Sequence, residues 1–482
     1  MYIDEIKSQI ENNIKILTKN YSPVVYSGKK VIHDSIHGTN SFEPFELAFI
    51  GLPMVQRLRY ISQTDVAYMV YPGTNHNRFE HSLGVAMIAK KMVNALYDNN
   101  PELEKIIKKD YIINHVSIAA ILHDTGHGPF SHLSESVYEK YIKFDQLIKD
   151  NKELVGGHSH EILSYFISTS DYMANFNKEH IEKNYGIKLD MQLIAEMIVG
   201  YIDKNNPERR KMAFAVEIIN GPFDADKLDY MARDSHATGL NLTLDIDRLL
   251  YTIDYTIKED IVRLAIDIAC ATSLEQIAIN KMMLYSSIYH HQKVRASGCV
   301  VKSFIDKLID KEGYASFIRS NDFDIYAELS RANNTFLDRQ LPHRLISLCK
   351  RTIDNKEKLA EIFQWNGDEQ QELINIIVNK CEECGIDIGQ DELWIDIPSP
   401  PGFKEAPNTL IKLYKNKGDC ITLNDVFPSN EWAKAFSENK WQGLIFTSNG
   451  HVKEISDIAK EILKNQYGIK INIFSDEICK IS

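Results

Sequence analysis

The spacing of apolar positions predicts a mostly α-helical chain. Between residues 33 and 300 apolar residues recur three or four positions apart, and turns rich in glycine, proline and asparagine interrupt them. Residues 1–32 are expected to form a helix and an extended segment, and residues 301–385 a helical extension. Over residues 386–482 the strand-like runs QGLIFTS and IKINIF flank an amphipathic stretch, which predicts a small α+β module.

Two of the predicted helices carry inward-pointing polar residues. The apolar stripe of the first comprises Val85, Ile88, Ala89, Met92, Val93 and Leu96. His81 lies four residues before this stripe on the same face, so its side chain is expected to point inward. The second helix, NHVSIAAILHD, is apolar on most faces and ends in His123 and Asp124, with Gly126 as its expected terminator.

These inward residues indicate a metal site. A buried carboxylate is costly unless it is paired or bound to a cation, and a divalent metal would satisfy an aspartate and two histidines at once. A hydrogen-bonded histidine pair with a capping aspartate is the alternative, and the complete set disfavours it. Pro222 is expected to open a further helix, in which Asp224 and Asp226 are each compatible with a fourth ligand or an N-terminal cap.

The helix expected after Pro222 also has a polar face. The residues close to this face are Asp226, Lys227, Tyr230 and Asp234. They supply a ligand, a cation, a ring and a carboxylate that can accept a hydrogen bond from a hydroxyl group. Such a surface suits a metal-bound phosphate attached to a sugar.

Composition narrows the possible functions. Of the 482 residues, 44 % are hydrophobic and 25 % charged, as in soluble globular proteins, and no apolar run is long enough to span a membrane. No signal peptide is recognised, so a cytoplasmic protein is expected. The formal net charge of −12 disfavours stable nucleic-acid binding. Seven scattered cysteines indicate reduced thiols, and the lone CxxC of Cys381 and Cys384 lacks the second pair of a structural zinc site.

Three ordered motifs resemble those of the HD-domain phosphohydrolases: RFEHSLG at 78–84, HDTGHGPFSH at 123–132 and DADKLDYMARDSHATG at 224–239. They are most similar to the branch of bacterial dGTP triphosphohydrolases and sterile-alpha-motif and HD-domain dNTP triphosphohydrolases, which VQRLRYI at 55–61 also resembles. The resemblance covers roughly residues 33–300. It implies an HD-domain helical core that hydrolyses deoxynucleoside triphosphates (dNTPs) to a deoxynucleoside and triphosphate.

The resemblance places the metal ligands at His81, His123, Asp124 and Asp226, which selects Asp226 over Asp224. It implies one divalent transition metal, namely iron, manganese or zinc, together with Mg²⁺ on the substrate phosphates.

The resemblance assigns proton transfer to His127, His132, Glu135 and His160. One of these histidines is expected to protonate the leaving 5′ oxygen, a task for a group that titrates near neutrality. Glu135 stands where a related enzyme has an aspartate, so its reach is longer by one methylene group.

Substrate contacts are implied in two regions. Near the metal, the residues implied to contact the phosphates, the sugar and the 3′-hydroxyl are Gln63, Arg78, Lys227, Tyr230 and Asp234. On a later helix, Lys281 stands where an arginine is common, which keeps the charge but loses bidentate phosphate geometry. Tyr285 stands where a histidine is common, and Tyr289 where a tyrosine packs against the sugar. Ordinary helix packing is the alternative for these aromatic residues.

A regulatory site is also implied, because Gln56 and Arg59 match a nucleotide site between subunits of regulated members. Gly51 stands where an aspartate reads guanine, so that mode of recognition is not expected here. An ordinary protein surface is the alternative for Arg57 and Arg59. The resemblance thus implies an activating nucleotide and a homo-oligomer, either a tetramer or a hexamer.

Two other functions are compatible with the sequence. One is a different HD-superfamily phosphohydrolase, such as a phosphodiesterase or a single-strand nuclease, in which His127 and His160 ligate a second metal. The other is a non-enzymatic nucleotide sensor, which the complete set of ligands and proton-transfer histidines disfavours. For a dNTP hydrolase, control of the dNTP pool and depletion of nucleotides during phage infection both fit the chemistry.

Overall fold

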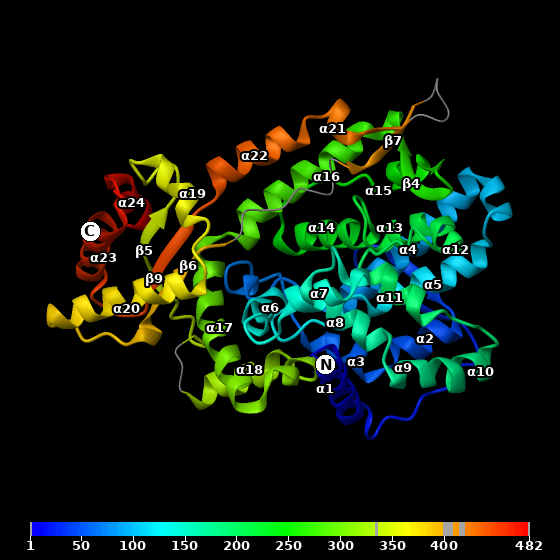
Figure 1. Cartoon of the computed structure of the whole chain (residues 1–482), viewed down its shortest axis with the longest axis horizontal. Helices are drawn as coiled ribbons and strands as arrows, with labels where there is room; N and C mark the ends of the chain where they lie inside the picture. Colours follow the sequence, from blue (N-terminus) through cyan, green and yellow to red (C-terminus); the bar gives the residue numbers. More distant parts are fainter. Residues whose placement is uncertain (1, 333–335, 399–407, 414–419, 481–482) are drawn as a thin grey trace. The chain divides into compact units, whose positions relative to one another are not determined.

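The structure is a computed structural model that describes residues 2–332, 336–398, 408–413 and 420–480. It is mostly α-helical with small sheets, which confirms the predicted fold class (Figure 1). The first of its two compact units comprises Met1–Lys281, Ile305–Ala327 and Lys404–Ser429. The second comprises Met282–Phe304, Glu328–Phe403 and Asn430–Ser482. Among the described residues, no helix combines the length and apolar character needed to cross a membrane.

The first unit is built mainly of helices. Those that lie wholly within it are α1 (Tyr2–Thr18), α2 (Pro44–Ile50), α3 (Pro53–Gln56), α4 (Arg78–Asn99), α5 (Lys109–Leu122), α6 (His132–Tyr138), α7 (Phe144–Asp150), α8 (Ser159–Ser168), α9 (Asp171–Phe176), α10 (Lys183–Tyr185), α11 (Met191–Ile198), α12 (Pro207–Lys211), α13 (Ala213–Ile219), α14 (Ala225–Thr238), α15 (Ile246–Tyr251) and α21 (Leu423–Val426). The unit boundaries fall within or at the edge of α16 (Ala271–Leu284), α17 (Gln292–Glu312), α18 (Asp322–Arg331) and α22 (Ser429–Lys440).

Helix α4 packs against both α5 and α14, and these three helices form the frame of the site. The predicted stripe of α4 is buried along its whole length, and His81 on the same face is fully buried. Asn77 caps this helix by accepting a hydrogen bond from the backbone N–H of Glu80, which fixes where the helix begins.

Two helix ends differ from those predicted. Helix α5 ends at Leu122, so Gly126 does not terminate it. Gly126 is instead required by packing, since a Cβ atom there would lie 2.2 Å from the carbonyl oxygen of His160 on α8. Pro222 does not open a helix either: α14 begins at Ala225, where Asp224 provides a side-chain cap that a proline cannot.

Short strands also occur in the first unit, some of them where helix is predicted. The first unit contains the hairpin of β1 (Lys30–Asp34) and β2 (Gly38–Phe42) and a sheet of order β3-β4-β7-β8, whose strands are Ile253–Lys258, Ile261–Asp267, Leu410–Lys412 and Cys420–Thr422. Strands β3 and β4 pair antiparallel, with Ile253 opposite Ile266. The helix prediction is wrong over β3 and β4 because a short run of buried apolar residues has no periodicity that separates strand from helix.

The second unit contains an antiparallel sheet of order β5-β9-β6, formed by His343–Leu348, Gly443–Thr447 and Leu393–Asp396. Its helices are α19 (Leu359–Ile362), α20 (Gly367–Glu383), α23 (Val452–Tyr467) and α24 (Ile473–Cys479), and α20 and α23 share an apolar core with the sheet. The predicted mixture of helices and strands is therefore present. The strand predicted for IKINIF is wrong, because Ile471 makes one bridge with Ile353 and α24 begins at Ile473.

Candidate metal centre

Four side chains from three helices converge in the first unit. His81 lies in the first turn of α4, His123 and Asp124 follow α5, and Asp226 lies in the first turn of α14. The ligand atoms of His81, His123 and Asp124 all lie within 4.8 Å of one another. Asp226 Oδ1 lies 2.9 Å from His81 Nε2 and 3.8 Å from His123 Nε2. The structure therefore brings together all four residues predicted as metal ligands.

Hydrogen bonds on the far side of each imidazole fix which nitrogen faces the centre. His81 Nδ1 donates to Asp229 Oδ2 at 2.7 Å, and His123 Nδ1 donates to the carbonyl oxygen of Ala120 at 2.7 Å. The Nε2 atoms consequently face the carboxylates of Asp124 and Asp226, and in the neutral ring each carries a lone pair that a cation can use. Two lone pairs and two carboxylates fit a divalent cation, with nitrogen and oxygen donors that suit iron, manganese or zinc.

The charged groups around the centre also favour a cation there. Burial alone would lower the pKa of His81, but Asp226 and Asp229 raise it to about 10. Burial would raise the pKa of Asp124, but the charge of Arg78 holds it well below its usual range. Arg78 Nη1 donates to Asp124 Oδ2 at 2.7 Å, so one oxygen of this carboxylate is already neutralised from outside the centre.

Asp229 supports the centre and was missed by sequence reasoning. Its buried carboxylate accepts from His81, from His37 Nε2 at 2.6 Å, and from Arg233 Nε and Nη2 at 2.9 and 2.8 Å. Burial would raise the pKa of Asp229, but these donors hold it well below its usual range. Arg233, one helical turn later, was the only local signal, and nothing in the sequence points to His37 or His81 as further partners.

A second cluster lies beside the centre and contains the four predicted proton-transfer residues. Glu135 Oε1 lies 2.8 Å from His160 Nδ1 and 3.1 Å from the Nδ1 atoms of both His127 and His132. His127 Nε2 also lies 3.4 Å from Asp124 Oδ1 and so adjoins the first centre. The ligand atoms of this cluster lie within 4.8 Å of one another, so it too could hold a metal ion.

The charges within this cluster are uneven. Burial alone would lower the pKa of His160, but Glu135 raises it to about 9. Burial, together with the charges of Arg78 and His160, lowers the pKa of His127 to about 3. At neutral pH the pair is therefore an imidazolium at His160 and a neutral imidazole at His127, with Glu135 ionised. Such separated pKa values are typical of acid–base sites.

The predicted substrate residues near the centre are also placed in the first unit. Lys227 Nζ donates to Asp224 Oδ2 at 2.6 Å, and Asp234 Oδ1 accepts from His76 Nε2 at 2.8 Å. Gln63 is buried, and its Oε1 finds no hydrogen-bond partner within the described ranges. Tyr230 lies on α14, between Asp226 and Asp234 in the sequence.

The predicted contacts on the later helix divide between the units. Lys281 is the last residue of α16 that belongs to the first unit. Tyr285 and Tyr289 belong to the second unit, where they form a π-helical turn with their rings edge to face at 5.2 Å.

Of the residues predicted for regulation, Arg59 is exposed and donates from Nε to Gln56 Oε1 at 2.8 Å, and its guanidinium covers the Phe79 ring at 3.6 Å. The surface alternative is wrong for Arg57. This residue is buried and donates to four backbone carbonyl oxygens: those of Thr125, His127, Phe317 and Ser320.

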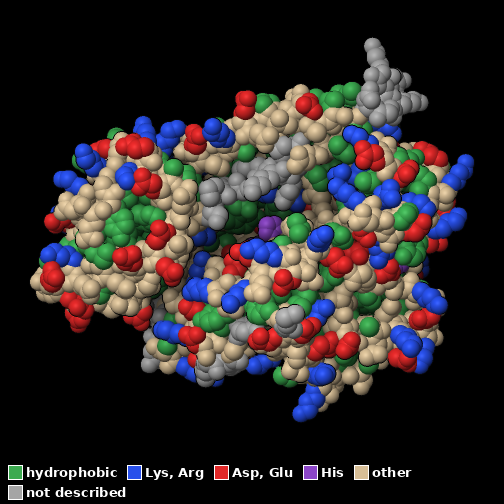
Figure 2. All heavy atoms as spheres, in the orientation of Figure 1, with side chains coloured by type: hydrophobic (Ala, Val, Ile, Leu, Met, Phe, Trp, Pro, Cys, Tyr) green, Lys and Arg blue, Asp and Glu red, His purple; other side chains and the backbone are tan. Residues whose placement is uncertain are grey.

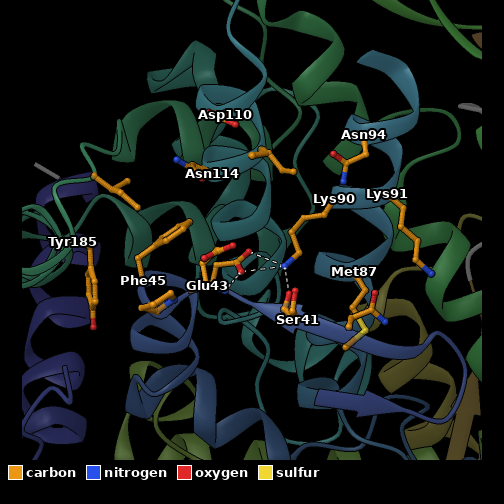
Figure 3. A pocket seen from close by; sticks show the side chains of 15 residues that line it. Ser41, Glu43, Phe45, Met87, Lys90, Lys91, Asn94, Asp110, Asn114 and Tyr185 are labelled. Atoms are coloured by element: carbon orange, nitrogen blue, oxygen red, sulfur yellow. Dashed lines mark hydrogen bonds and ion pairs between the residues drawn. The ribbon is translucent and has the colours of Figure 1, made fainter. Parts of the chain in front are cut away.

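Two cavities lie near these elements. One of about 430 Å³ is lined by His76, Glu80 and Arg233 and so adjoins the His76–Asp234 pair. The other, of about 630 Å³, lies between β2, α2, α4, α5 and Tyr185, and none of the predicted site residues lines it (Figure 3). Lys90 in the larger cavity donates to Glu46 and to the Ser41 carbonyl oxygen, both at 3.0 Å. On the face seen in Figure 2, acidic and basic side chains of the described residues are interspersed.

Comparison with known proteins matches residues 78–205 to the HD domain and residues 244–468 to the HD associated region. The deoxynucleoside triphosphate triphosphohydrolase SAMHD1 of Mus musculus is 35 % identical over 252 residues, covering 48 % of this chain and 36 % of that protein. The Homo sapiens protein of the same name is 36 % identical over 237 residues, covering 46 % and 35 %. An uncharacterised Methanocaldococcus jannaschii protein is 28 % identical over 434 residues, covering 89 % of this chain and 81 % of that protein. The chain thus spans little more than a third of the SAMHD1 proteins that it matches.

Proposed function

Because the chain carries an HD domain followed by an HD associated region, and so belongs to the HD-domain family, we propose that it hydrolyses dNTPs to a deoxynucleoside and triphosphate. The observation that carries this proposal is the convergence of His81, His123, Asp124 and Asp226 beside the Glu135–histidine cluster. The test is to incubate the protein with each dNTP and each NTP, singly and in mixtures, and to separate the products by chromatography.

In this proposal His81, His123, Asp124 and Asp226 would hold one transition metal, which would supply Lewis-acid chemistry at the α-phosphate, and Mg²⁺ would accompany the substrate phosphates. Arg78 and Lys227 bind phosphate oxygens. Tyr230 lies against the sugar, and Asp234 and Gln63 orient the 3′-hydroxyl. On the later helix, Lys281 is proposed to add a charge for the phosphates, and Tyr285 and Tyr289 are proposed to contact the nucleoside.

The leaving 5′ oxygen needs a proton, and we assign its supply to the Glu135–histidine cluster. His160 is the group held protonated at neutral pH, because the Glu135 carboxylate accepts from it. His127, which stays neutral, lies between the Glu135–His160 pair and Asp124. The exposed His132 is the member of the cluster that faces solvent.

We expect the wild-type reaction to release intact triphosphate. Helix α14 carries both the proposed metal ligand Asp226 and the proposed sugar-binding carboxylate Asp234, so a metal held there would act at the phosphate attached to the sugar. Phosphorus NMR of the reaction mixture distinguishes the products. Pyrophosphate with a nucleoside monophosphate would contradict the assignment and favour another phosphohydrolase.

We also propose a regulatory nucleotide site at Gln56 and Arg59 and expect any activator to act without a strict need for GTP. A carboxylate accepts from the N1 and N2 donors of guanine, and Gly51 offers no acceptor side chain. A Cβ atom at position 51 would meet only ordinary contacts of 3.4 Å and more, so Gly51→Ala is a clean comparison.

The regulatory prediction is tested by titrating GTP and each dNTP as activators against a fixed second substrate. Activation by a dNTP, or no activation, is the expected result. Strict dependence on GTP that survives Gly51→Ala but is lost in Arg59→Ala would show that other groups read guanine.

A second candidate function rests on the second cluster. If His127, His132, Glu135 and His160 hold another ion, the protein would be a two-metal phosphodiesterase or single-strand nuclease. Elemental analysis separates the two, since the dNTP hydrolase is proposed to hold one transition metal per chain. We further propose that the protein is a homo-oligomer, a tetramer or a hexamer, that acts in dNTP-pool control or in nucleotide depletion against phage.

A further inference from the structure

The loop that follows the HD motif contains an unusual turn. Phe130 and Ser131 both have positive φ angles, 53° and 52°, although neither is glycine. Residues in such conformations are strained and persist only where their surroundings fix them. The turn lies directly before His132 at the start of α6, so its conformation sets where that side chain begins.

One buried carboxylate holds this turn. Asp322, at the start of α18, accepts from the backbone N–H of Phe130 at 2.7 Å through Oδ1. Through Oδ2 it accepts from the backbone N–H and the hydroxyl of Ser62, at 2.9 and 2.6 Å. Asp322 is 5 % exposed, and burial raises its pKa to about 6 even though these donors oppose the shift.

The contacts continue from Asp322 to the metal centre. Ser131 donates from Oγ to the Ser62 carbonyl oxygen at 2.5 Å and accepts from Arg78 Nε at 2.7 Å. Arg78 in turn donates to Asp124 at 2.7 Å and reaches His132 Nε2 at 3.5 Å. The turn therefore orients a phosphate-binding residue and a proton-transfer residue at the same time.

The segment that carries Asp322 makes two further contacts with the loop. The carbonyl oxygens of Phe317 and Ser320 share the Arg57 guanidinium with those of Thr125 and His127. The Tyr326 ring packs edge to face on Phe130, with centroids 5.3 Å apart. This segment lies within the HD associated region and outside the residues matched to the HD domain.

We propose that Asp322 is a positioning residue for the reaction: its carboxylate fixes the Phe130–Ser131 turn and thereby holds Arg78 and His132 in their working orientation. This inference rests on the proposed function. A carboxylate suits the position because it offers only acceptors to three donors. An asparagine of the same size would turn an NH₂ group towards one of them.

The test compares Asp322→Asn with Asp324→Asn. Asp324 lies two residues later and is exposed, and its carboxylate accepts from the backbone N–H of Asn321, so it is a charge-matched control. We expect Asp322→Asn to lower kcat by roughly 10- to 100-fold with KM changed less than twofold, because a small misplacement of reacting groups is that costly. Metal content should be unchanged, and amide exchange over residues 128–132 should be faster by roughly 10-fold or more. The control should match the wild type.

Ser62→Ala provides a second variant if Asp322→Asn does not fold. It removes one of the three donors and leaves the bond to Phe130, so a smaller fall in kcat and intermediate exchange are expected. Unchanged exchange over the turn in Asp322→Asn, or the same change in Asp324→Asn, would overturn the proposal. If the wild type hydrolyses no dNTP, the proposed function fails, whereas the exchange comparison still decides whether Asp322 holds the turn.

Discussion

Replacing Asp226 or His123 by alanine is expected to remove the bound transition metal and to lower kcat/KM by roughly 10³-fold or more. The two residues contribute donors from different segments: Asp226 Oδ1 lies 2.9 Å from His81 Nε2, and His123 Nε2 lies 3.3 Å from Asp124 Oδ1. With either one absent, the remaining donors still carry buried charge but no longer surround the ion. The measurement is elemental analysis of the purified variants, combined with dNTP turnover.

Asp224→Asn is the matched control for the metal. Asp224 is the neighbouring carboxylate that spacing alone could not exclude, but in the structure it caps α14 and pairs with Lys227. Asparagine retains an acceptor for the cap, so this variant should keep its metal. Full metal occupancy in both Asp226→Ala and His123→Ala would mean that the centre lies elsewhere.

Glu135→Gln is expected to shift the pH dependence of the reaction. The pKa of His160 is raised to about 9 by Glu135, so the wild type keeps this proton, and its activity, until the pH rises through about 9. Without the carboxylate, burial leaves the pKa at or below its ordinary value of about 6.5. The alkaline limb should therefore move down by roughly 2 units or more, and kcat at pH 8 should fall by roughly 30-fold.

A neighbouring carboxylate separates this effect from a general loss of charge. Glu139, one turn after Glu135, accepts from the Ser159 hydroxyl, and among the described residues no ion pair joins it to the histidine cluster. Glu139→Gln should leave the alkaline limb in place. A Glu135→Gln profile that retains a limb near pH 9 would show that the proton comes from a group outside the pair.

The sequence predicted those parts of the site that depend on short-range spacing. The apolar stripe of α4 predicted that His81 points inward, because helical periodicity is a local property. The ordered motifs indicated Asp226, although α14 begins three residues later than expected. The small strands were lost for the opposite reason. Strands β3 and β4 are recognisable only through their pairing with each other, which no local pattern records.

The supporting residues could not be predicted because each acts across a long stretch of chain. Asp229 bonds to His37, Arg57 to Ser320 and Asp322 to Phe130. A charged residue in a mixed polar and apolar stretch, as Arg57 is between Gln56 and Leu58, has the same local pattern on a surface as in a buried network. Only the tertiary fold distinguishes the two, since burial and partner arise together.

The metal ligands come from α4, from the end of α5 and from α14, and this arrangement links binding to folding. An unfolded chain holds these donors far apart, so a cation that binds only the folded form stabilises it by mass action, in proportion to the logarithm of its free concentration. Without the cation, folding brings the carboxylates of Asp124 and Asp226 close to each other and to the Nε2 atoms of His81 and His123, with no bound cation between them. The abundance of the active protein in a cell would then follow the supply of the metal as well as the rate of synthesis.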